Sequence, residues 1–221
     1  MASFRAIETI SRVLVDLLEA SHELLVPDEE PEPSEPSPLH EPLQFAVYQG
    51  EDFRSPGADE VSTGVTLFLY RTVVNGTTRT PPGRRLSSGE PQRSQLPLDL
   101  HYLVTIWAGS ASTQHQIAGW VMRVLETTPI LPKGVLNDIN EEVFRPDETV
   151  EIILNDLSNE DLFRIWDILG EPYRLSIPYL VRNVRIESEE TVPAEGIVER
   201  RIFDLLQHGS DNGSTEPIGG D

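Results

Sequence analysis

Asp99 and His101 are the residues whose types and spacing come nearest to an acid–base pair. They lie two positions apart in segment 98–106, where apolar and polar residues alternate. In a strand, both side chains would point to the same face. Catalysis would also need a nucleophile at a recognisable spacing, and none accompanies the pair. We therefore favour a hydrogen bond at the surface or between subunits, with a small hydrolase as the alternative.

Other catalytic patterns are missing from the sequence. The segment Gly109–Ser112 lacks the closing glycine of a nucleophile elbow, and no glycine-rich phosphate-binding loop occurs. The five histidines are scattered at spacings that build no metal site, and there is no cysteine to supply a thiolate. The sequence therefore predicts no catalytic residue, no cofactor-binding residue and no metal ligand.

The charge balance restricts the possible partners. The chain carries 37 acidic and 17 basic residues, for a formal net charge of -20. Such a chain repels nucleic acid and anionic membranes unless its basic residues gather on one face. No apolar run is long enough to span a bilayer, and Asp16 and Glu19 interrupt the N-terminal apolar stretch. We expect a protein that folds in the cytoplasm and binds neither nucleic acid nor membranes.

Three segments place apolar residues at helical spacing and predict amphipathic helices. The last of them begins at Ser158, which forms a capping-box-like start with Asp161, and it ends at Gly170. Trp120 and Trp166 lie on the apolar stripes, which favours packing in a core over stacking on a ligand. The three segments are 4–19, 113–126 and 158–169.

Five segments predict strands, and the longest has two unusual features. Its apolar residues change from odd to even positions near Arg182, which predicts a bulge or bend. Pro178 cannot donate to a ladder, so this strand lies at an edge of the sheet or its proline occupies a non-bonded position. The order of helices and strands predicts an α+β fold, a single domain with a mixed sheet and helices packed on it. The strands are expected at 43–48, 64–70, 98–106 (with one face buried), 150–154 and 173–186.

Two segments differ from the rest in composition. Residues 27–42 contain six prolines and six carboxylates without Lys or Arg, which is typical of a mobile loop. Residues 75–95 contain four arginines and one acid and predict an exposed basic loop. We assign 1–187 to one domain that includes both loops, 188–207 to a C-terminal arm, and 208–221 to a disordered tail.

Several segments resemble one protein family. The most specific is the strand Leu96–Thr105, which reads Leu-Pro-Leu-Asp-Leu-His-Tyr-Leu-Val-Thr. Together the segments resemble the tube-terminating cap proteins of extracellular contractile injection systems, the virulence-cassette and antifeeding-prophage group related to phage tail terminators. The resemblance runs from the first helix to about Glu187. The other segments that carry it are 64–71, 125–131, 164–166 and 172–179.

The resemblance implies a function without catalysis or cofactors. Members of that family form a six-membered ring at the end of the inner tube and sheath. The ring stops the growth of both polymers and holds the last sheath layer extended. The implied partners are further copies of the chain, the inner tube protein and the sheath protein. Assembly in the cytoplasm and incorporation into a phage-tail-like particle are implied as well. The alternative is a non-catalytic adaptor that joins two assembly components.

The predicted interface lies on the last strand and the arm after it. If the strand 173–186 is an edge, it or the arm could add to strands of the terminal sheath subunits. The acidic stretch 27–42 either repels a further incoming ring or is an inert insertion. The interface residues that we expect are Tyr179, Arg182, Arg185, Arg200 and Arg201.

Overall fold

The structure is a computed structural model. It describes residues 4–25, 38–54, 60–79, 95–137, 143–144 and 148–187. The predicted basic loop lies outside these residues from position 80 to 94, and so do most of the acidic stretch and everything after Glu187. The assignments of a C-terminal arm and a disordered tail therefore stay predictions.

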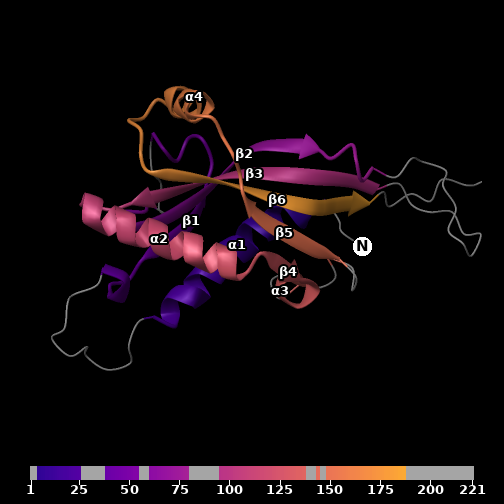
Figure 1. The fold of residues 1–221 in the computed structure, drawn as a ribbon, viewed down its shortest axis with the longest axis horizontal. Helices are drawn as coiled ribbons and strands as arrows, with labels where there is room; N and C mark the ends of the chain where they lie inside the picture. The colour runs from indigo at the N-terminus through magenta and orange to yellow at the C-terminus, as the bar shows by residue number, and fades with distance from the viewer. Residues whose placement is uncertain are drawn as a thin grey trace, which may run out of the picture. The chain divides into compact units, whose positions relative to one another are not determined.

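A six-stranded sheet forms the centre of the fold, with strand order β1-β2-β3-β6-β5-β4 (Figure 1). β1 runs parallel to β2, and all other neighbouring strands are antiparallel, so the sheet is mixed as predicted. The strands are β1 (Gln44–Tyr48), β2 (Gly64–Val74), β3 (Gln95–Trp107), β4 (Ile130–Pro132), β5 (Thr149–Leu154) and β6 (Ser176–Glu187).

Helices cover both faces of this sheet. α1, α2 and α3 lie on one side, and α4 lies on the other (Figure 1). The predicted helices correspond to α1, α2 and α4, whereas α3, β4 and the 3-10 helix η1 were not predicted. The bounds are α1 (Ala6–Glu23), η1 (Pro38–His40), α2 (Ala111–Thr127), α3 (Lys133–Asn137) and α4 (Asn159–Leu169).

β3 separates the two cores. Tyr102, Val104 and Ile106 pack with α1 and α2, while Leu103 and Trp107 pack with α4. Because successive strand residues point to opposite faces, β3 is buried on both faces from Tyr102 onwards. The prediction of one buried face was therefore wrong for this half of the strand, because a helix covers each face.

β6 lies between β3 and β5, so the prediction that it forms an edge was wrong. The alternative prediction, that Pro178 occupies a position that needs no hydrogen-bond donor, is confirmed. Its carbonyl accepts a hydrogen bond from the Asn155 amide at 2.9 Å, so its nitrogen also faces the end of β5 and away from β3. The β5–β6 pairing stops at Leu154–Tyr179. The missing donor therefore costs the β3–β6 ladder nothing.

The bulge predicted near Arg182 is confirmed. Between Leu98 and Leu100 of β3, the paired residues on β6 step from Val184 to Val181, so β6 carries one extra residue. Asn183 in this bulge has φ 66°, a left-handed conformation. The extra residue explains why the apolar residues that pack in the core change from odd positions, 177, 179 and 181, to even ones, 184 and 186.

Candidate interaction surfaces

Tyr179, the first predicted interface residue, is 2% exposed and belongs to the core under α1 and α2. Burial raises the pKa of its hydroxyl to about 12, and the carboxylate of Glu126 adds to the increase. Among the described residues, no group forms a hydrogen bond with this hydroxyl. In this structure the side chain therefore fills the core, and its role at an interface stays a prediction.

The two described arginines of the predicted interface lie around the β6 bulge. Arg182 is in the bulge and approaches Glu151 of β5, with 3.9 Å between Nη1 and Oε2, and both side chains are 42% exposed. Arg185 is half-buried and lies opposite Pro97 of β3. An exposed ion pair of this length contributes little to stability, so Arg182 can exchange its partner at low cost. Arg200 and Arg201 lie outside the described residues.

The structure gives Asp99 and His101 separate hydrogen-bond partners. The Asp99 carboxylate accepts from Asn75 Nδ2 at 3.2 Å. Asn155 Nδ2 donates to His101 Nδ1 at 3.3 Å and to the Tyr70 hydroxyl at 3.2 Å. Burial lowers the pKa of His101, as does the charge of Arg71, while Asp99 opposes the change. The neutral imidazole is thus a hydrogen-bond acceptor that links β3 to the end of β5.

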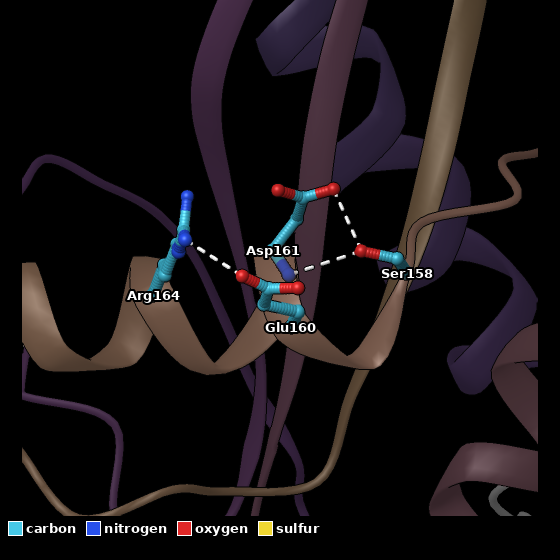
Figure 2. Close-up of polar contacts among 4 residues, drawn as sticks. All are labelled: Ser158, Glu160, Asp161 and Arg164. Carbon is cyan, nitrogen blue, oxygen red and sulfur yellow. Dashed lines mark hydrogen bonds and ion pairs between the residues drawn. The ribbon is translucent and has the colours of Figure 1, made fainter.

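α4 begins with the predicted cap. Ser158 Oγ accepts a hydrogen bond from the Asp161 amide at 3.1 Å and donates to Asp161 Oδ2 at 2.7 Å (Figure 2). One turn further on, Arg164 contacts Glu160 with 2.6 Å between Nη2 and Oε1. At the other end, Gly170 has φ 76° and closes the helix. These contacts define where α4 begins and where it ends.

α4 also exposes two large apolar side chains that the helix pattern did not predict. Phe163 is 51% exposed and Ile168 is 75% exposed, and Tyr173 stacks edge-on against Phe163 with 5.5 Å between ring centroids. The inner side of α4 is buried through Leu162 and Trp166. Phe163 and Ile168 lie off the apolar stripe that predicted the helix, on opposite sides of it.

The part of the chain that the structure describes contains no group of three metal-ligating side chains. Within the same residues, no helix combines the length and apolarity that crossing a membrane requires.

A family model described as the Pvc16 N-terminal domain matches residues 9–200. The chain is also similar to the PVC sheath/tube terminator in the extended state, from a cryo-EM structure of an extracellular contractile injection system. The TM-score is 0.48 at 15% identity, over 91% of this chain and 72% of that one. The cryo-EM structure of the anti-feeding prophage cap, the AFP tube terminating cap, is similar with a TM-score of 0.43 at 18% identity, over 75% and 63% of the two chains. No curated protein matches the chain.

Proposed function

This chain belongs to the Pvc16 N-terminal domain family of tube terminators, and we propose that it is the structural cap of a contractile injection system. The observation that carries the proposal is the family match over residues 9–200, which includes every strand of the sheet. In this role the chain forms a ring of six copies on the end of the inner tube and sheath. The ring stops both polymers and holds the last sheath layer extended. The role needs no catalytic residue and no cofactor.

The physical requirement of such a cap is asymmetry. Rings of a tube stack head to tail by a heterologous contact, which repeats until a subunit presents one matching face and one non-matching face. The chain therefore contacts copies of itself in the ring and binds the inner tube and sheath proteins on one side only. It assembles in the cytoplasm and remains part of the finished particle.

Arginine side chains supply the charged contact with the sheath. Residues 179–181 of β6 are paired with both β3 and β5, so this part of β6 cannot accept a further strand, and we assign strand addition to the sheath to the arm 188–207. Arg182 and Arg185 stand on β6 close to where this arm begins, and Arg200 and Arg201 lie within it. The four arginines thus form a charged complement to an acidic sheath surface.

Deletion of the chain tests the terminator role. We expect particles whose tubes have uncontrolled length or whose sheaths are absent or contracted, and electron micrographs measure both. Restoring the chain should restore a narrow length distribution and a six-fold ring at one end. Normal length and intact extended sheaths without the chain would remove the proposal. A chain that co-purifies with particles without forming a ring would favour the adaptor.

Charge reversal tests the arginine contact within the same system. The double variant Arg182→Glu/Arg185→Glu should lower the amount of chain that co-purifies with sheathed particles by about tenfold. The matched control reverses the charges of Arg123 on α2 and Arg164 on α4, which are both exposed. Arg164 forms an ion pair, as Arg182 does, so each variant removes one such pair. Equal co-purification of both variants would discard the arginine contact and leave the cap role standing.

The acidic stretch is tested by a shortened deletion. Removing residues 28–36 takes out five carboxylates but keeps η1, whose Leu39 packs against the core and accepts a hydrogen bond from His22 Nε2 at 3.1 Å. If these carboxylates repel a further ring, the variant should give longer or stacked particles. Unchanged lengths would identify the stretch as an inert insertion.

A further inference from the structure

A groove of about 510 Å³ lies between α1 and the edge strand β1. One wall is made of five successive residues, 43–47, and the other comes from α1 through Arg12, Val15, Asp16 and Glu19. Side chains of a strand alternate between its two faces. Successive residues can line one groove only where the backbone edge itself forms the wall. Among the residues that the structure describes, β1 is the outermost strand on this side of the sheet, and the groove follows its outer edge.

The hydrogen-bonding groups of that edge can be assigned to single residues. The Gln44 amide donates to Thr63 at 3.0 Å, which places the backbone groups of Gln44 on the side of β2. Because these groups alternate along a strand, Phe45 and Val47 direct their N–H and C=O groups away from β2. Val47 is 44% exposed. Two residues of β1 thus present a complete set of donors and acceptors to an added strand.

The charge of the groove selects what can lie in it. Asp16 and Glu19 from α1 and Glu60 beside β1 supply three carboxylates. Arg12, the one basic residue among those that line the groove, contacts Glu8 on its own helix with 2.9 Å between Nη2 and Oε1. Burial raises the pKa of Glu19, and the nearby carboxylates of Asp16 and Glu23 raise it further. A basic strand would relieve this repulsion.

The chain itself contains a segment of that character. Residues 79–93 carry four arginines and one acid in a chain of net charge -20. Within them, residues 83–88 read Gly-Arg-Arg-Leu-Ser-Ser, a proline-free run as long as β1 needs, with prolines on both sides at 82 and 91. A closed ring requires each subunit to offer one surface and accept another. An acidic groove and a basic segment on the same chain meet this requirement.

We propose that residues 83–88 of a neighbouring copy add to β1 as a strand in this groove, with Arg85 on the face toward Asp16 and Glu19 and Arg84 on the opposite face. The inference rests on the proposed ring and adds its subunit contact. Main-chain hydrogen bonds to Phe45 and Val47 supply affinity, and the carboxylates supply the choice of partner. The acceptor surface of each subunit lies along β1, and the donor segment follows β2.

The chain has no cysteine, which makes the contact measurable by cross-linking. One full-length variant carries Val47→Cys and a second carries Ser87→Cys. When the two variants are mixed and oxidised, they should form a disulfide-linked dimer of twice the chain mass. The amount of this dimer should be at least tenfold higher than in the control mixture. The control pairs Ser87→Cys with Phe163→Cys, which is similarly exposed but lies on α4. Adding Asp16→Lys/Glu19→Lys to the Val47→Cys chain should abolish the excess.

The experiment is run on the purified chain and on particles that contain both variants. A dimer excess in either preparation supports the inference, and no excess in both overturns it. A double variant that forms its cross-link only within one chain would also overturn it, because the segment would then occupy its own groove. Capped particles of normal length without the cross-link would remove this contact and leave the cap role. Particles that lack the chain and yet have normal length and extended sheaths would remove the cap role instead.

Discussion

At the scale of single residues, two buried tyrosines provide a matched comparison. Tyr102 is fully buried, and its hydroxyl shares a 2.7 Å hydrogen bond with Ser11 Oγ of α1. The hydroxyl of Tyr179, which lies opposite Tyr102 on β6, is buried without a partner among the described residues. A buried hydroxyl contributes to stability only when it is bonded. The same substitution should therefore have different effects at the two positions.

Tyr102→Phe should lower the free energy of unfolding by about 1 kcal/mol, because it removes the bond to Ser11. Tyr179→Phe should leave the free energy unchanged or raise it slightly, because no bond is lost and less polar surface is buried. Urea denaturation of both variants measures the difference. Equal destabilisation would mean that the Tyr179 hydroxyl has a partner, for example a buried water.

Asn183 tests the β6 bulge. Its φ of 66° costs most residues about 1–2 kcal/mol, while glycine adopts it freely and asparagine tolerates it. Asn183→Gly should therefore retain the stability of the native chain, and Asn183→Ala should be about 1 kcal/mol less stable than the glycine variant. Thermal and urea unfolding measure both. An alanine variant as stable as the glycine variant would show that the bulge relaxes to another register.

At the scale of elements, Gly64 determines how closely β1 approaches β2. It has φ 154° and pairs with Gln44, and a Cβ added at this position would lie 1.9 Å from the Gln44 carbonyl oxygen. Gly64→Ala should therefore displace β1 and lower the free energy of unfolding by about 2–4 kcal/mol. Hydrogen exchange should accelerate most in the β1–β2 pair. The matched control is Gly119→Ala on the exposed side of α2, where a Cβ meets nothing within 4 Å. This control should raise stability by up to about 1 kcal/mol.

The sequence predicted elements well wherever the cause was local. The cap at Ser158, the stop at Gly170 and the bulge near Arg182 depend on neighbouring residues, and all three are confirmed. The prediction that β6 forms an edge was wrong because the position of β6 in the sheet depends on its pairing with β5, which is more than 20 residues away in the sequence. A proline excludes one hydrogen bond, and only the pairing of the sheet decides which side of the strand loses it. Short elements such as β4 and α3 give too few residues for a periodicity.

The candidate surfaces were harder to predict than the fold, for the same reason. The groove between α1 and β1 joins residues from positions 12 and 47, and no spacing in the sequence indicates that they meet. The residues Phe163 and Ile168, which α4 exposes, lie off the apolar stripe that predicted the helix. Arg182 was chosen for its charge alone, and the structure adds that its partner Glu151 is on the neighbouring strand. The charge and type of each residue are given by the sequence, but the surface that these residues form together can be predicted only when the strand order of the sheet is known.

At the scale of the whole molecule, the net charge of -20 should make stability depend on salt. Repulsion among carboxylates destabilises the compact state, and screening becomes short-ranged as the Debye length falls from about 10 Å at 0.1 M to about 3 Å at 1 M salt. The described ion pairs are exposed, so they lose little when salt is added. We therefore expect the Tm to rise by several degrees between about 0.02 and 0.5 M NaCl.

The variant without residues 28–36 has five fewer carboxylates, so its Tm should rise less with salt. A Tm that falls with salt would mean that attraction between opposite charges outweighs this repulsion, as it would in a ring held by arginines in acidic grooves. Repeating the titration at several protein concentrations separates the two cases, because only the stability of an assembled ring depends on concentration.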